Sequence, residues 1–197
     1  MNYYKLNPNP ESKKWKGYEV PNIDLWHNGD ELSEYTLYKM CKQLDFAELE
    51  YRTLVDGKIP PISHIGSCFI MFSSNIADIE SIGLLPGLQL IPVVNKSNLH
   101  KYFLLNNYKQ IDCVDWKKSE VDKWPTEHRV EEWQNKRGRF FITPVLIKSK
   151  IPNNLDIFRL QEWSSAFNTI ISEKLKEKIF SLDFDKSFLT FDLLKTV

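Results

Sequence analysis

Short apolar runs separated by turn-forming residues dominate the hydrophobic pattern of this 197-residue chain. Runs of about four to eight apolar residues bounded by Gly, Pro, Asn or Asp are typical of buried or half-buried strands. They predict strands at residues 2–6, 15–20, 49–55, 68–72, 88–94, 102–105 and 188–193. Pro21 is expected to end the second of these strands. The apolar run 139–148 contains Pro144, which favours a bulge or an edge position there.

Helical periodicity is confined to a few short segments. Apolar residues at i, i+3, i+4 and i+7 predict a helix over 34–44, behind the capping residue Ser33. Further short helices are expected after Ser73 or Ser74 (about 75–82), after Thr126, and after Ser172. The order of strand, capped helix, turn and strand thus occurs twice, at Ser73 and at Ser172. Two interpretations stay open, a pseudo-repeat and chance, because few residues are identical between the copies.

These elements predict an α+β fold, with a mainly antiparallel sheet and a few short helices. There is neither a long linker nor a low-complexity tract. We therefore expect a single domain over residues 1–197, which is long enough to bury a substantial core.

The segment 102–119 joins two strand-like runs through Asn106 and Asn107, residues that tolerate turns. In the second run, 111–116, strand alternation places Asp112 and Asp115 on opposite faces. A buried carboxylate without a partner is costly. The strand therefore either ends near Val114, or both acids have partners.

The charge of the chain is balanced overall but unevenly distributed. It has 26 basic and 26 acidic residues, which argues against a general nucleic-acid-binding protein. Residues 24–50 hold seven acids against two lysines, a balance of −5, whereas residues 136–197 hold eleven bases against seven acids, a balance of +4. An acidic region that meets a basic partner is one interpretation, and a solvated surface is the other.

Cysteine usage and apolar-segment length indicate the compartment. The odd set Cys41, Cys68 and Cys113 lies among apolar neighbours, as expected of buried, reduced thiols. The N-terminal residues contain no apolar signal segment, and no apolar stretch is long enough to span a membrane. We expect a soluble, cytoplasmic protein.

Catalytic and cofactor-binding patterns are not found. The four histidines, His27, His64, His100 and His128, lack metal-ligand spacing, and no phosphate-binding loop or dinucleotide fingerprint occurs. We therefore predict a protein that is not an enzyme and that binds no metal, cofactor or nucleic acid. The alternatives are a small cytoplasmic enzyme that uses Asp112 and Asp115 or a Cys–His pair, and a nucleic-acid-associated module that uses the basic C-terminal region.

Tryptophans beside charged residues indicate a protein-binding surface, because Trp is enriched at interface hot spots. Cores also use Trp, so each single residue is weak support. The candidate partner-binding residues are Trp26, Asp30, Glu31, Glu34, Trp116, Glu131 and Trp133. We favour the acidic segment 24–50 with Trp26 as the binding face, and the segment 116–133 is its rival.

A set of motifs in the second half of the chain resembles a known family. The first consists of Leu105, Asn106, Asp112, Cys113, Asp115 and Ser119, an L-N pair followed by a D-C-x-D-x-x-x-S run. Upstream, residues 87–93 fit a G-x-Q-x-x-P-V strand, and downstream 156–160 and 171–176 fit a closing IFRL and S-E-x-L-K segment. Over roughly residues 70–194 the chain is similar to a bacterial immunity family of polymorphic toxin systems, immunity family eleven. Residues 183–186 depart from the family's Thr-Gly turn.

The resemblance implies a role in competition between bacteria. It suggests an immunity protein that binds a cognate toxin acting in the cytoplasm and neutralises it by stoichiometric occlusion of the active site. It also implies that Leu105, Asn106, Asp112, Asp115 and Ser119 are structural. The oligomeric state is left open.

Overall fold

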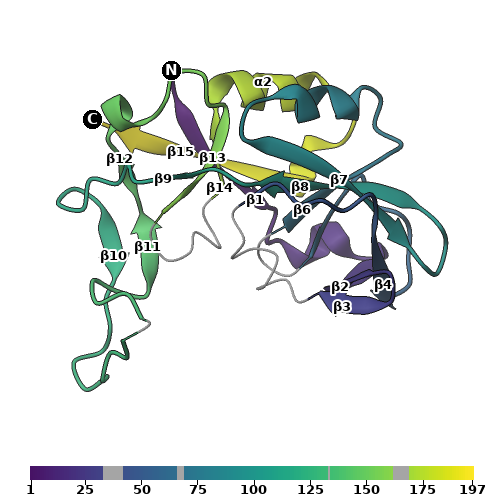
Figure 1. Ribbon diagram of the computed structural model, residues 1–197, viewed down its shortest axis with the longest axis horizontal. Helices are drawn as coiled ribbons and strands as arrows, with labels where there is room; N and C mark the ends of the chain where they lie inside the picture. Colours follow the sequence, from purple (N-terminus) through teal and green to yellow (C-terminus); the bar gives the residue numbers. More distant parts are fainter. Residues whose placement is uncertain (33–41, 66–68, 133, 162–168) are drawn as a thin grey trace.

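The computed structural model describes residues 1–32, 42–65, 69–132, 134–161 and 169–197, and in it two β-sheets form the body of the molecule (Figure 1). A two-stranded arm projects from this body at the lower left of Figure 1. The α-helix α2 (Glu173–Ser181) lies along the top of the same view. This arrangement confirms the predicted α+β class with a mainly antiparallel sheet.

The seven-stranded sheet has the order β3-β2-β4-β7-β8-β6-β5. Its strands are β2 (Val20–His27), β3 (Asp30–Leu32), β4 (Leu49–Val55), β5 (Ile62–Ile65), β6 (Phe69–Ser73), β7 (Leu88–Asn95) and β8 (Lys101–Asn107). All neighbours are antiparallel except β4 and β7, which run parallel.

The six-stranded sheet has the order β12-β15-β1-β14-β13-β9. Its strands are β1 (Tyr3–Pro8), β9 (Gln110–Ile111), β12 (Val145–Leu146), β13 (Ile157–Leu160), β14 (Thr169–Ser172) and β15 (Leu189–Thr196). The edge pairs β12–β15 and β13–β9 are parallel, and the inner pairs are antiparallel. The arm is the antiparallel pair β10 (Glu120–Asp122) and β11 (Phe140–Thr143).

Helices are short in the described residues. The α-helix is α2 (Glu173–Ser181), and the 3-10 helices are η1 (Ser12–Trp15), η2 (Ile79–Leu84), η3 (Lys148–Lys150) and η5 (Lys186–Phe188). Ser172 caps α2, since its hydroxyl accepts a hydrogen bond from the Leu175 amide at 3.2 Å. Leu175 and Ile179 form the buried stripe of this helix.

One apolar cluster joins the two sheets. It contains Leu6 and Ile171 from the six-stranded sheet, Phe72 and Leu105 from the seven-stranded sheet, and residues of α2 and η2. A second cluster covers the other face of the seven-stranded sheet, around Tyr51 and Tyr102. A third surrounds Phe158 and Cys113 on the other face of the six-stranded sheet and extends to the base of the arm.

The two copies of the possible pseudo-repeat occupy equivalent positions in the two sheets. Strands β6 and β7 flank β8, and β14 and β15 flank β1, with antiparallel pairing in all four cases. The connecting helices, η2 and α2, meet where the Lys178 ammonium donates to the Ser81 carbonyl at 2.5 Å. Each copy is thus a strand–helix–strand unit with another strand inserted between its two strands.

The strand at 49–55 and the helix after Ser172 are confirmed, but several other predicted elements are wrong. Residues 15–19 contain the end of η1, a turn and a single β-bridge at Tyr18 rather than a strand. β2 begins at Val20 and continues through Pro21 at a register shift, where the missing amide is tolerated. The strand-like run predicted over 111–116 is not a strand beyond Ile111, where β9 ends. Asn106 and Asn107, which were expected to interrupt the two runs, belong to β8.

The remaining differences concern helices. Residues 75–82 form turns and the start of η2, because Asp78 has a left-handed backbone (φ 58°) that an α-helix does not allow. Residues 126–132 form turns without a helix. Most of the predicted helix at 34–44, and also Cys41 and Cys68, lie outside the described residues, while 42–44 are not helical. Pro144 separates β11 from β12 where the chain passes from the arm to the six-stranded sheet.

Candidate partner-binding surface

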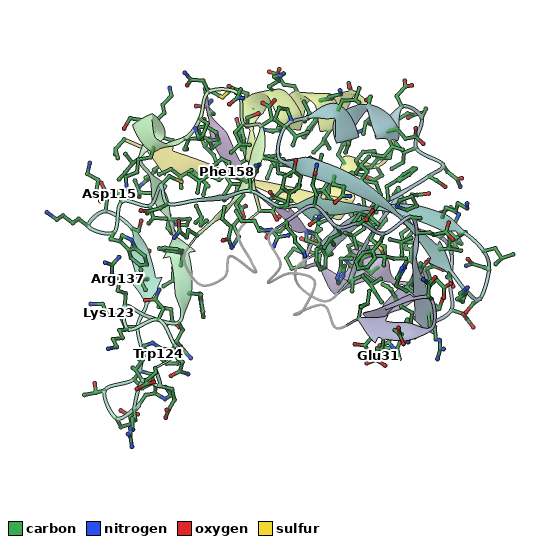
Figure 2. All side chains as sticks on the ribbon, viewed as in Figure 1. Glu31, Asp115, Lys123, Trp124, Arg137 and Phe158 are labelled. Atoms are coloured by element: carbon green, nitrogen blue, oxygen red, sulfur yellow. The ribbon has the colours of Figure 1, made fainter. Side chains whose placement is uncertain are left out.

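The β2–β3 hairpin presents the acidic residues of the first candidate face. Asn28 and Gly29 form its two-residue turn with positive φ values of 52° and 90°, as a tight hairpin requires. The turn exposes Asp30 and Glu31, and Figure 2 shows Glu31 on β3 at the lower right of the molecule. Glu34 lies outside the described residues.

Trp26 lies on the same face as Glu31, because the two residues are cross-strand partners. On its other side Trp26 pairs with Glu50 of β4, and the Arg52 guanidinium lies 4.7 Å from the centre of the indole ring. The half-buried ring is thus held by a cation–π contact and surrounded by charge.

The sheet extends this arrangement into a row of side chains on one face. Glu50 is in register with Val94 of β7, and Val94 with Lys101 of β8. Residues in register across adjacent strands point to the same face. We call the resulting set the tryptophan row, and it consists of Glu31, Trp26, Glu50, Val94 and Lys101.

Ion pairs neutralise the middle and the Lys101 end of the tryptophan row but not its hairpin end. Lys96 pairs with Glu50, and Lys101 lies 3.6 Å from Glu48. Asp30 and Glu31 take part in none of the ion pairs between the residues that the structure describes. Their charge is therefore available to a partner.

Arg52, Glu50 and Lys101 were not among the predicted binding residues. The alternation that places Glu50 and Arg52 on one face of β4 is a sequence signal for two of them. No local signal indicates Lys101, whose place in the row depends on the parallel pairing of β4 with β7.

The rival face lies on the arm. Trp116 is half-buried at the arm's base, with the Arg137 guanidinium 4.3 Å from its ring centre and the Phe141 ring at 5.0 Å. Glu131 is exposed in the connection between β10 and β11, and Trp133 lies outside the described residues. In Figure 2 the arm, marked by Trp124, lies far to the left of Glu31, so the view separates the two candidate faces.

The motif residues Asp115 and Ser119 build the turn that leads into the arm. The Asp115 carboxylate accepts hydrogen bonds from the amides of Lys117 (3.0 Å) and Lys118 (3.2 Å). The Ser119 hydroxyl donates to the Asp115 carbonyl at 2.7 Å and accepts from the Val145 amide at 2.8 Å. This turn therefore links the start of β10 to the start of β12.

Two further motif residues hold the segment before β4. The Gln89 side chain exchanges hydrogen bonds with the amide and carbonyl of Leu44, at 2.9 and 2.7 Å. The Asn106 amide donates to Gln89 and to the Lys42 carbonyl, at 3.0 and 3.1 Å. Leu105 lies in the cluster that joins the sheets.

The closing motif connects β13 with α2. Buried Asp156 accepts a hydrogen bond from the Ser172 hydroxyl at 2.6 Å and pairs with Lys174 at 3.0 Å. Because Ser172 is also the helix cap, this carboxylate fixes the cap and thereby the start of α2.

The residues of the enzyme alternative have separate partners. Asp112 is exposed and lies 3.6 Å from Lys150, whereas Asp115 binds backbone amides. Cys113 is completely buried. Within the described ranges no group of three His, Cys, Asp or Glu residues is arranged to hold a metal ion.

A buried polar network around Glu19 was not predicted. The Glu19 carboxylate accepts hydrogen bonds from the hydroxyls of Tyr51 (2.5 Å) and Tyr102 (3.0 Å), and from the side-chain amides of Asn95 and Asn98 (both 3.1 Å). Burial, followed by interaction with Glu19, raises the pKa of Tyr51. Burial is also the main cause that raises the pKa of Tyr102. A carboxylate bonded in this way stabilises the fold rather than indicating a reaction.

In a comparison with known families, the profile of the Immunity protein family (Imm11) matches residues 91–191. This range includes β8, the Asp115–Ser119 turn, the arm, β13 and α2. A comparison with curated proteins gives no match. Among the helices that the structure describes, none has the length and apolar character of a membrane span.

Proposed function

Because the chain belongs to the Immunity protein family (Imm11), we propose that it binds a cognate bacterial toxin in the cytoplasm and neutralises it stoichiometrically. The bound protein covers the toxin's active site and so protects the producing cell and its kin. In this proposal residues 1–197 act as one domain, and the protein is an inhibitor without catalytic activity of its own.

The observation that carries the proposed binding mode is the uncompensated charge of Asp30 and Glu31 beside Trp26. Exposed carboxylates attract a basic catalytic site over a distance of about one Debye length, roughly 8–10 Å at physiological salt. A rigid aromatic side chain then supplies contact area at a low entropic cost. The hairpin therefore combines a charge that speeds capture with an anchor that slows release.

Coexpression with the product of the gene directly upstream of this chain's gene, which we expect to encode the toxin domain, tests the function. Cells that produce this toxin domain are expected to die without the protein and to survive with it. The purified pair is expected to form a complex of fixed stoichiometry in which the toxin is inactive. Survival without complex formation would contradict occlusion, and death despite high expression would contradict immunity against that toxin.

A further inference from the structure

An open groove continues from the Lys101 end of the tryptophan row. It has a volume of about 730 Å³ and is lined by residues of β7, β8 and the segment 74–81, with Glu48 at its rim. Pro92 and Phe103, which are cross-strand partners, form the half-buried part of its apolar lining, to which Ile76, Ala77 and Ile79 also belong. They lie two residues along their strands from Val94 and Lys101, on the same face of the sheet.

The groove carries a negative charge opposite this apolar surface. Asp78 and Glu80 are exposed and line it, and neither belongs to an ion pair between described residues. The cation that lines the groove, Lys101, is already paired with Glu48. A ligand in the groove therefore meets two uncompensated carboxylates and two half-buried apolar side chains.

We propose that this groove receives an arginine- or lysine-bearing segment of the toxin. The aliphatic part of such a side chain packs on Pro92 and Phe103, and its cationic head binds Asp78 and Glu80. Charge complementarity selects this occupant, because an acidic segment or a nucleic-acid backbone would meet like charge.

The inference rests on the proposed function and enlarges it. The groove lies on the face that carries Trp26 and Glu31, so one partner can contact the hairpin and the groove together. The hairpin end would then capture the toxin, and the groove would fix the orientation of a basic segment.

Titration with an N-acetylated hexa-arginine peptide, followed by backbone amide NMR, tests the groove without the toxin. We expect concentration-dependent shifts at Ile79, Lys101 and Phe103 in the wild-type protein. Asp78→Asn combined with Glu80→Gln is expected to weaken this binding about tenfold, as loss of two charge-assisted contacts predicts. Glu11→Gln with Asp183→Asn removes the same charge from residues outside the groove and should bind like wild type. Absence of shifts at these three residues, or equal effects of both double variants, would overturn the proposal.

The same variants separate this inference from the proposed function. If wild-type protein binds the neighbouring toxin domain and the groove variant binds it equally well, the groove inference is wrong and the function stands. If the peptide occupies the groove but the toxin domain is not bound, the groove chemistry stands and its assignment to that toxin fails. Circular dichroism of each variant confirms that the fold is retained.

Discussion

Asn106 and Asn107 are adjacent, equally buried at 2% exposure, and opposite in their hydrogen bonding. The Asn106 side chain bonds to Gln89 and to the Lys42 carbonyl on one face of the sheet. The Asn107 side chain faces the other side, and neither its oxygen nor its nitrogen has a hydrogen-bond partner among the described residues. The two asparagines therefore provide a matched comparison of a satisfied and an unsatisfied buried amide.

Asn106→Ala is expected to lower the free energy of unfolding by about 2 kcal/mol, because it leaves the Lys42 carbonyl without this donor and removes one of the two donors to the Gln89 side-chain oxygen. Asn107→Ala should cost less than about 1 kcal/mol, since the deleted amide forms no bond within the described structure. Urea unfolding of both variants measures the difference. Equal losses would mean that the Asn107 amide has a partner in solution.

Reversing the hairpin charge should slow toxin binding. Asp30→Lys with Glu31→Lys is expected to reduce the association rate about tenfold at low salt and to have less effect at high salt, as electrostatic steering predicts. Glu11→Lys with Asp183→Lys makes the same change in net charge elsewhere and should leave the rate near that of wild type. Stopped-flow measurement of the association rate at two salt concentrations distinguishes the two double variants. Equal slowing by both double variants would mean that only net charge matters.

Trp26→Ala should mainly raise the rate at which the toxin dissociates from the protein. Removing a desolvated aromatic anchor is expected to cost on the order of 2 kcal/mol of binding, mostly as faster release. Trp116→Ala serves as the comparison, because its ring packs on Phe141 and Arg137 and its loss should lower stability rather than affinity. Dissociation rates and melting temperatures of both variants test this. If Trp116→Ala releases the toxin and Trp26→Ala does not, the arm is the binding face.

Alkaline pH should destabilise the fold through Tyr51 and Tyr102. Burial raises the pKa of both hydroxyls above the ordinary value of 10.0, so the folded protein keeps protons that the unfolded chain loses. The resulting stability is complete below about pH 10 and is lost as pH rises above it. Tyr51→Phe should flatten this decline, and Tyr18→Phe, outside the Glu19 network, should not. Denaturant titrations from pH 8 to about 11.5 measure both slopes.

Short-range sequence patterns were sufficient to predict the elements whose structure depends mainly on their own residues. The alternation of 49–55 predicts β4, and Ser172 with Leu175 and Ile179 predicts α2 and its cap. At Pro21 a strong local signal was misleading, because a register shift between β2 and β4 accommodates the proline. At 75–82 the capping serine was followed by Asp78, whose left-handed backbone delays the helical turn until η2.

The candidate surface was predictable only in part. Trp26, Asp30 and Glu31 were found from charge and residue type, and the structure places Trp26 and Glu31 side by side. The groove was not predicted, because Pro92, Lys101 and Asp78 become neighbours only through long-range pairing and the fold of 74–81. No periodicity reports which strands will lie next to each other.

The position of β1 has a consequence for protein synthesis. β1 lies between β14 and β15, so it has to wait for these two later strands before its sheet closes. The strands β2 to β8 are consecutive, and their sheet has all its partners much earlier. Nascent chains arrested before residue 169 should therefore protect the seven-stranded sheet from protease while β1 stays cleavable. Closure of the six-stranded sheet is therefore a late step of synthesis, because it needs β15.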